Sequence, residues 1–256
     1  MRLTHASRIL ILFLLCRLVS AQELRLAAAA DLQFAFQEIA ARFKNETGHA
    51  VQLTFGSSGN FFAQIQNGAP FDLFFSADAD YPRKLEAAGL AEPGSFYEYA
   101  TGKIVILAPK DSSLALDRGL QVLLDPGVRK IAIANPEHAP YGRAAVEALR
   151  HGNIYDRVAA KLVMGENISQ AASFVVSGSA DVGIVAISLA RAPATRQKAK
   201  YGEIPTTDYP PIHQAAMILK SSSQKELSRQ FMAYLRSPAI QALLRDYGFS
   251  IPDTKP

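Results

Sequence analysis

Four short turns of this sequence carry the features that bind anions through neutral hydrogen-bond donors. Each turn stands where an apolar, strand-like segment ends and a helix-like segment begins. The start of a helix leaves backbone N–H groups without intrahelical partners and lies at the positive end of the helix dipole. Both properties favour an anion at that position. The four turns cover residues 27–31, 56–60, 139–142 and 166–169.

The turn at 56–60 adds side-chain donors to these backbone groups. Its sequence is Gly-Ser-Ser-Gly-Asn, so Ser57 and Ser58 both offer a hydroxyl hydrogen. Neither this turn nor the one at 166–169 contains a lysine or an arginine, so oriented dipoles would meet the charge of a bound oxyanion. Ordinary helix capping explains any one turn alone. The hypothesis of one shared site rests on four such turns, two in each half of the chain.

The same residues form no catalytic motif. The run at 56–60 misses the G-x-S-x-G spacing of a nucleophile elbow because Asn60 replaces the last glycine, and it lacks the Gly-Lys-Ser/Thr of a P-loop. No metal-ligand spacing relates the histidines that follow the N-terminal segment, which are His49, His138, His151 and His213. We therefore expect a protein that is no enzyme and has no catalytic residue and no cofactor. A secreted serine hydrolase that uses Ser58 is the distant alternative.

The N-terminal segment has the pattern of a secretory signal peptide. Arg2 and Arg8 give it a positive start, residues 9–15 form its apolar core, and Val-Ser-Ala at 19–21 is a small-residue cleavage site. We expect cleavage after residue 21 and a periplasmic mature protein. Cys16, the only cysteine, leaves with the signal, which excludes disulfides and thiolate chemistry from the mature chain.

Cleavage also removes most of the apparent basicity. The whole chain has 27 Lys and Arg residues against 23 Asp and Glu residues, a net charge of +4. Arg2, Arg8 and Arg17 leave with the signal and no acidic residue does, so the mature chain carries a net charge of only +1. A charge this small gives no reason to expect a nucleic acid or an anionic membrane as a partner.

Strand-like and helix-like patterns alternate along the mature chain. This alternation predicts α/β lobes on mainly parallel sheets, where ligands bind beyond the carboxyl ends of the strands. The expected strands are 24–29, 49–55, 72–76, 103–108, 130–134, 182–187 and 213–219, and a short helix and strand share 156–163. The expected helices are 32–45, 61–67, 82–88, 142–150, 169–177, 224–236 and 238–247.

An internal echo predicts two similar lobes. Residues 68–76 and 178–186 each hold a helix-ending glycine, a turn, an aspartate and an apolar strand, although chance also explains such a match. If the C-terminal helices return to the first lobe, two crossover strands must connect the lobes. The apolar segments 103–108 and 213–219 are the natural candidates. The expected organisation is a signal peptide at 1–21, a first lobe at 22–102 plus 214–256, and a second lobe at 103–213.

At the four turns the sequence resembles the periplasmic molybdate-binding proteins, and the resemblance covers essentially the whole mature chain. The matching stretches are AAAADLQFAFQEIAARF, FGSSGNFFAQIQNGAPFDLFFSADADYPRKL, LAPK, ANPEHAPYGRAAVEAL, SADVGIVA and YGF, of which GAPFDLFFSAD with NPEHAPYG is the specific combination. The resemblance implies a type II periplasmic-binding-protein-like fold, two α/β lobes joined by two crossover strands with a ligand cleft between them. It also implies a monomer that captures molybdate or tungstate for the membrane permease of an ABC importer. Sulfate or phosphate is the alternative ligand.

The resemblance also implies the residues that touch the ligand. Ala30, Asp31 and Ser58 would contact it from the first lobe, and the backbone N–H groups of Tyr141 and Ile168 from the second. Ser57 is the alternative to Ser58, because a pattern does not separate adjacent serines. Ser58, Tyr141 and Ile168 would touch a metal only as contacts of molybdate, and no site for a bare cation is expected.

Two positions depart from the best-known family pattern. Ala186 stands where a tyrosine hydroxyl is usual, so either the Tyr141 hydroxyl replaces that donor or only the Tyr141 backbone N–H is used. Asp31 stands where a serine is usual, and three interpretations are open. Its carboxylate caps the following helix, or it is protonated and donates a hydrogen bond to the ligand, or it coordinates the metal centre or recruits a cation.

Overall fold

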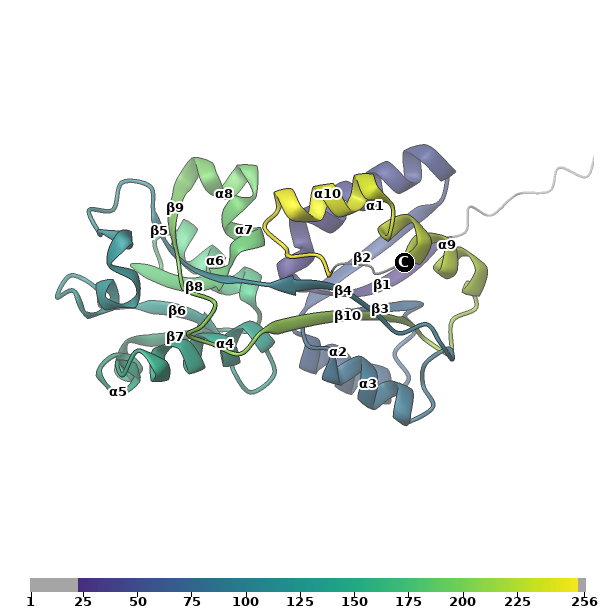
Figure 1. Cartoon of the computed structure of the whole chain (residues 1–256), viewed down its shortest axis with the longest axis horizontal. Helices are drawn as coiled ribbons and strands as arrows, with labels where there is room; N and C mark the ends of the chain where they lie inside the picture. The colour runs from purple at the N-terminus through teal and green to yellow at the C-terminus, as the bar shows by residue number, and fades with distance from the viewer. Residues whose placement is uncertain (1–22, 253–256) are drawn as a thin grey trace, which may run out of the picture.

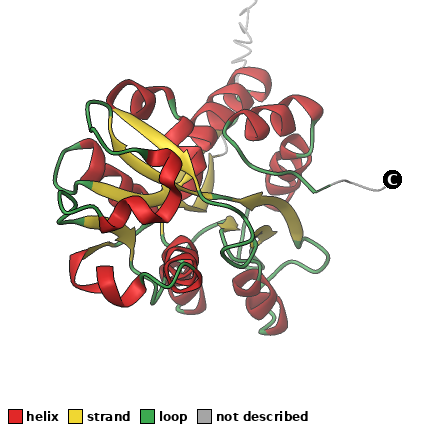
Figure 2. Ribbon diagram, turned by 60° about the vertical axis from the view of Figure 1, so that its left-hand side comes forward, coloured by secondary structure: helices red, strands yellow, loops and turns green. Residues whose placement is uncertain are grey.

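The computed structural model describes residues 23–252, so the predicted signal peptide lies outside the described residues. The described residues form two α/β lobes joined by two extended connections (Figure 1). Each lobe is built on one five-stranded sheet, with helices packed around it (Figure 2). This arrangement is the predicted fold class. Within residues 23–252, no helix combines the length and the apolar character needed to span a membrane.

The first lobe has the strand order β2-β1-β3-β10-β4. The strands β2 and β3 run parallel to β1, and β10 runs antiparallel to both of its neighbours. The strands are β1 (Glu23–Ala29), β2 (Ala50–Gly56), β3 (Leu73–Ser76), β4 (Tyr97–Gly102) and β10 (Ile212–Ile218). The helices are the 3-10 helix η1 (Ala30–Leu32), then α1 (Gln33–Thr47), α2 (Ser58–Gln66), α3 (Asp80–Ala87), α9 (Lys225–Leu235) and α10 (Pro238–Asp246).

The second lobe repeats this pattern with the strand order β7-β6-β8-β5-β9. Here β5 is the strand that runs antiparallel to its neighbours. The strands are β5 (Ile104–Pro109), β6 (Ile131–Ala134), β7 (Leu162–Gly165), β8 (Val182–Ala186) and β9 (Ala199–Glu203). The helices are η2 (Leu116–Leu124), α4 (Pro140–His151), α5 (Tyr155–Val158), η3 (Ala159–Lys161), α6 (Ile168–Val176), α7 (Ile187–Arg191) and α8 (Pro193–Lys198).

The echo detected in the sequence corresponds to equivalent positions in the two sheets. The strands β3 and β8 both occupy the central place, and an aspartate precedes each of them. The Arg25 N–H donates to Asp72 Oδ2 over 2.9 Å, and the Lys130 N–H donates to Asp181 Oδ2 over 2.8 Å. Each carboxylate therefore ties the start of the neighbouring parallel strand, so the shared pattern has the same structural role in both lobes.

The chain passes between the lobes at two places. The strand β4 lies in the first sheet and leads through Lys103 directly into β5 of the second sheet, while residues 204–211 connect β9 to β10. The segments 103–108 and 213–219, expected as the crossing strands, thus lie almost wholly within one sheet each. The strands at the other end of each connection, β4 and β9, were not predicted from the sequence.

Aromatic packing explains why the C-terminal helices return to the first lobe. Phe231 of α9 packs edge-on against Phe43 of α1, with ring centroids 5.1 Å apart, and contacts Phe75 of β3 at 6.1 Å. Phe36 of α1 lies 4.8 Å from the Phe75 ring. These side chains are fully buried, and such aromatic pairs stabilise a fold beyond their buried area alone.

Candidate anion-binding site

A small cavity lies between the two lobes, at the carboxyl ends of their strands. All six residues predicted for the site line it, namely Ala30, Asp31, Ser57, Ser58, Tyr141 and Ile168. The lining is completed by Ala29, Gly56, Ala77, Ala139 and Pro140. None of these lining residues is a lysine, an arginine or a histidine. The structure therefore brings the four predicted turns together around a space that no cationic side chain lines.

Ser58 has a hydroxyl hydrogen free for a ligand. The Ala77 N–H donates to Ser58 Oγ over 2.9 Å, and Ser58 donates to no other group among residues 23–252. The side chain is fully buried and lies in the first turn of α2. Since the oxygen is held by Ala77 and the hydrogen is unused, Ser58 can donate into the cavity.

Ser57 is already engaged by other groups. Its Oγ caps α2 by accepting from the Asn60 N–H at 3.4 Å, which makes the helix begin at Ser58, three residues before the predicted start. The same oxygen lies 2.9 Å from His138 Nδ1 of the other lobe. These two contacts favour Ser58 over Ser57 as the donor to an anion.

The second lobe contributes the first turns of two helices. Pro140 begins α4, two residues before the predicted start, because proline suits the first position of a helix. The side chain of Asn167 caps α6 by accepting from the Gln170 N–H at 3.0 Å. Tyr141 and Ile168 lie in these first turns, where N–H groups have no intrahelical partner. Both residues line the cavity, so the positive ends of their helices lie beside it.

Asp31 belongs to a buried hydrogen-bond cluster that spans both lobes. Its Oδ2 accepts from the Tyr141 hydroxyl at 2.9 Å and from Gln214 Nε2 at 2.7 Å. Gln214 Nε2 also lies 2.8 Å from Tyr141 Oη, and the Tyr99 hydroxyl donates to Gln214 Oε1 over 2.7 Å. We call Asp31, Tyr99, Tyr141 and Gln214 the inner cluster. Its side chains are at most 2% exposed.

The capping interpretation of Asp31 is wrong. Asp31 lies inside the 3-10 helix η1, and Leu32, which has no side-chain cap, precedes α1. The carboxylate therefore points away from the first turn of α1 and into the inner cluster. The Tyr141 hydroxyl likewise uses its hydrogen for Asp31, which favours the interpretation that Tyr141 serves an anion through its backbone N–H.

Burial shifts the titration of the inner cluster. Loss of water raises the pKa of Asp31 to about 6, although the hydrogen bonds from Gln214 and Tyr141 act in the opposite direction. Burial, together with the charge of Asp31, also raises the pKa values of Tyr99 and Tyr141 well above that of a free tyrosine. The cluster therefore holds its tyrosines neutral while its carboxyl group titrates near neutral pH.

Sequence reasoning missed Gln214, Tyr99 and Gly102. A Cβ on Gly102 would lie 2.1 Å from Tyr141 Oη and 2.7 Å from Gln214 Nε2, so only glycine leaves room for the cluster. Gln214 carried a detectable signal, since it is a polar residue directly before the apolar run Ala215–Ile218 of its strand. Tyr99 carried none, because strand β4 itself was not predicted.

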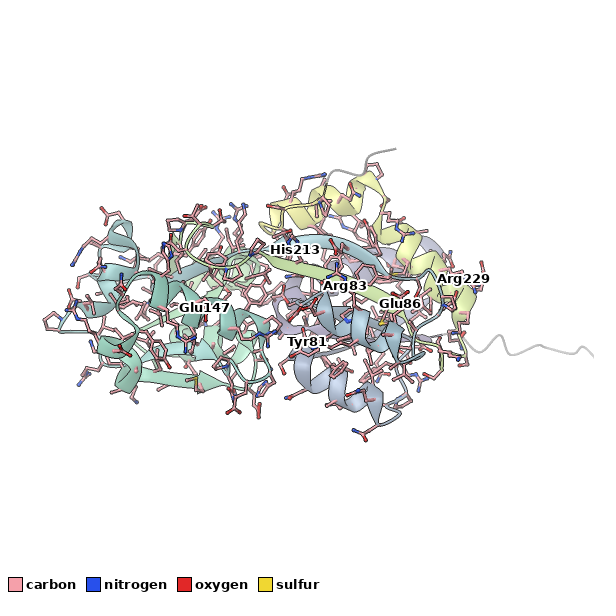
Figure 3. All side chains as sticks on the ribbon, turned by 60° about the horizontal axis from the view of Figure 1, so that its bottom comes forward. Tyr81, Arg83, Glu86, Glu147, His213 and Arg229 are labelled. Atoms are coloured by element: carbon pink, nitrogen blue, oxygen red, sulfur yellow. The ribbon has the colours of Figure 1, made fainter. Side chains whose placement is uncertain are left out.

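Further contacts between the lobes lie outside the cavity, and we call the next two, Arg143 with Asp78 and Gly59 with His138, the outer contacts. Arg143 of α4 pairs with Asp78 over 2.5 Å, and the Gly59 N–H donates to the His138 carbonyl over 3.0 Å. Within the second lobe, His138 Nε2 lies 3.5 Å from the exposed Glu166 carboxylate. In Figure 3, Tyr81 and Arg83 lie on the first lobe and Glu147 lies on the second, while His213 lies near the start of β10. Ser188 of α7 donates to the Asp31 carbonyl over 2.7 Å within the interface.

The described part of the chain contains no group of three or more His, Cys, Asp or Glu side chains arranged to hold a metal ion.

Comparison with known proteins places this architecture in a family. The profile of the family described as bacterial extracellular solute-binding proteins matches residues 24–250. The chain therefore belongs to the bacterial extracellular solute-binding proteins. It is 37% identical to the molybdate-binding protein ModA of Rhodobacter capsulatus, over 90% of this chain and 89% of that protein. It is 36% identical to ModA of Azotobacter vinelandii, over 93% of this chain and 94% of that protein.

A solved structure extends the similarity to the fold. The periplasmic molybdate-binding protein of Azotobacter vinelandii superposes with a TM-score of 0.85 at 38% identity, covering 90% of this chain and all of that one. The predicted resemblance to periplasmic molybdate-binding proteins is thereby confirmed.

Proposed function

We propose that this protein captures molybdate or tungstate outside the cytoplasm and delivers it to the membrane permease of an ABC importer. The observation that carries the proposal is the cavity between the lobes. It is lined by helix starts and the free hydroxyl hydrogen of Ser58, with no cationic side chain. Such a site suits an oxyanion whose charge is met by oriented dipoles. Relatives matching nearly the full length carry molybdate in their names, which supports this ligand.

The tightness of the cavity indicates how the ligand enters. Its volume is about 10 Å³, which is room for about one water molecule. A tetrahedral oxyanion with four oxygen atoms is larger. We therefore infer that the lobes separate to admit the anion and close around it, with Lys103 and residues 204–211 as the connections that bend. The lobe ranges that we propose are 22–102 plus 214–256 and 103–213.

We further propose that the site has no catalytic role. Ser58 has no histidine among its hydrogen-bond partners. Ser57, His138 and Glu166 lie in the order of a hydrolytic triad, but Ser57 caps a helix and the His138–Glu166 separation is 3.5 Å. Glu166 is 69% exposed, so it orients the imidazole weakly. Ester turnover that Ser57→Ala or Ser58→Ala abolishes would contradict this part of the proposal.

Calorimetry with molybdate, tungstate, sulfate and phosphate tests the proposed ligand. We expect tight binding of molybdate and tungstate and weaker binding of the other two. Ser58→Ala removes a hydrogen bond to a charged group, worth about 1.5–3 kcal/mol, and should weaken binding by about ten- to a hundredfold. Ser228→Ala is the matched control, because Ser228 is equally buried but lies in α9 and does not line the cavity. Preference for sulfate or phosphate over molybdate would reject the proposed ligand.

The periplasmic location and the partner are part of the same proposal. Cleavage after residue 21 releases a monomer that the permease of the importer recognises. N-terminal sequencing of the exported protein tests the cleavage site, and light scattering tests the monomer.

A further inference from the structure

The carboxyl group of Asp31 is placed where a dianion would bind, without a cation beside it. Asp31 lines the cavity and is 1% exposed. The groups that face its carboxylate are the Tyr141 hydroxyl from α4 and the Gln214 amide from β10, with the Tyr99 hydroxyl from β4 behind them. Among residues 23–252, no lysine, arginine or histidine forms an ion pair with Asp31. An ionised Asp31 and a bound dianion would therefore repel each other, because a buried site screens charges less than water does.

The two oxygen atoms of Asp31 have different surroundings. Oδ2 accepts two hydrogen bonds, from Tyr141 and Gln214. Oδ1 is buried and has no hydrogen-bond partner. A buried polar atom without a partner is costly, because it has lost its water and gained nothing in exchange. A group that arrives in the cavity is the available partner for Oδ1.

The cluster also fixes the direction of its hydrogen bonds. The Tyr99 hydroxyl donates to Gln214 Oε1, which orients the amide so that Nε2 faces Asp31 Oδ2. Oδ2 is therefore surrounded by donors and is not the place for a further hydrogen. If Asp31 carries a proton, that proton lies on Oδ1.

We propose that Asp31 binds the oxyanion as a neutral acid, with the Oδ1 hydrogen donated to a ligand oxygen. A fully deprotonated dianion then enters the site together with one proton taken from the solvent. The inference rests on the proposed function, since it requires an oxyanion in this cavity. No covalent bond forms or breaks except the O–H bond of the carboxyl group. The burial that shifts the pKa of Asp31 toward neutrality acts in the same direction as the charge of the anion.

Asp31 also becomes a specificity-determining residue under this inference. Molybdate, tungstate and sulfate carry no hydrogen at neutral pH and need the one on Oδ1. Hydrogen phosphate brings a hydrogen of its own and can donate it to an ionised Asp31. Rising pH should therefore weaken the binding of molybdate relative to that of phosphate.

Calorimetry at pH 5 and pH 8 tests the inference, with sodium molybdate titrated in pairs of buffers that differ in ionisation enthalpy. We expect uptake of about one proton per bound anion at pH 8 and almost none at pH 5, where free Asp31 is already protonated. The dissociation constant should rise by up to about tenfold per pH unit above the pKa of free Asp31.

Asp31→Asn is the matched variant. Its side-chain oxygen can accept from Tyr141 and Gln214, and its amide N–H₂ can donate into the cavity. We expect this variant to bind molybdate more tightly than the wild type at pH 8, without proton uptake and with little change between the two pH values. A folded Asp31→Asn protein that loses binding would overturn the inference and indicate direct coordination of the metal centre or a recruited cation.

Measurements on the wild-type protein distinguish a failure of the Asp31 inference from a failure of the proposed function. Tight binding of molybdate at pH 8 without proton uptake would overturn the role of Asp31 and leave the proposed function intact. Absence of binding for all four anions at both pH values would overturn the proposed function and this inference with it.

Discussion

The two sets of contacts that join the lobes differ in burial, and this difference decides what each can control. The inner cluster is at most 2% exposed. In the outer contacts, by contrast, the side chains of Asp78 and Arg143 are 28% and 38% exposed. Charges in water are screened within about 10 Å at moderate salt, whereas buried charges are screened much less. The inner cluster should therefore respond to pH, and the outer contacts to salt.

The burial of Asp31 also makes the stability of the folded protein depend on pH. The pKa of Asp31 is about 6 in the folded protein, above its usual value near 4. Between these values the unfolded chain loses the proton while the folded protein keeps it. The folded state is then destabilised as pH rises, until the penalty levels off above pH 6.

The largest effect that we predict is on the stability of Asp31→Asn. Because the variant has no carboxyl group to ionise, it should be more stable than the wild type at pH 8 by up to about 3 kcal/mol, or about 1.4 kcal/mol per unit of pKa shift. The gain should be largely lost at pH 4, where Asp31 is protonated in the folded protein and about half protonated in the unfolded chain. Urea unfolding of both proteins at the two pH values measures the difference.

Asp181 provides a control of the opposite sign. Burial acts to raise the pKa of Asp181, but the hydrogen bonds from the Arg129 and Lys130 N–H groups outweigh it and lower that pKa. Asp181 therefore stabilises the folded protein above the pH at which the unfolded group ionises, and loses this effect in acid. Asp181→Asn should be less stable than the wild type at pH 8. An Asp31→Asn protein that behaves like Asp181→Asn would show that the inner cluster holds an ionised carboxylate without penalty.

The next largest effect is predicted for Gly102→Ala, which disrupts the inner cluster by a steric clash. Gly102→Ala places a methyl group 2.1 Å from Tyr141 Oη, so Tyr141 must move or the lobes must stay apart. Overpacking of this kind costs about 1–3 kcal/mol, which should weaken molybdate binding by between about fivefold and a hundredfold. Gly152→Ala is the control, since its Cβ meets nothing closer than 3.4 Å and its φ of −73° suits alanine. Equal affinities for the two variants would show that Tyr141 is not needed in this position.

The same contrast explains what the sequence could predict. The four turns were found because each depends on local signals, a strand end followed by a helix start, and the structure gathers all six predicted residues around one cavity. Most predicted strands and helices are present, with ends shifted by a few residues. Helix α2 starts early because Ser57 caps it, a detail of side-chain geometry that apolar periodicity does not contain.

The inner cluster could not be predicted in the same way, because it is made by tertiary contacts. Asp31, Tyr141 and Gln214 are separated by 110 and 73 positions in the chain, and no local pattern relates them. Capping of the helix by Asp31 was one of three interpretations of the sequence, because Asp31 precedes an apolar periodic segment. In the structure Asp31 lies in the intervening 3-10 helix. Its buried carboxylate accepts hydrogen bonds from Tyr141 of the second lobe and from Gln214.

The smallest predicted effect concerns the outer contacts. Arg143→Ala removes the ion pair with Asp78 that joins the lobes, an exposed pair of the kind worth about 0.2–1 kcal/mol. Molybdate affinity should fall by no more than about fivefold at low salt, and the difference should vanish in 1 M salt. Arg150→Ala is the control, because Arg150 lies on the same helix but pairs with Glu147 three residues away, within one lobe. Its affinity should match the wild type. A loss that persists for Arg143→Ala in high salt would mean that this pair, despite its exposure, holds the lobes together as the inner cluster does.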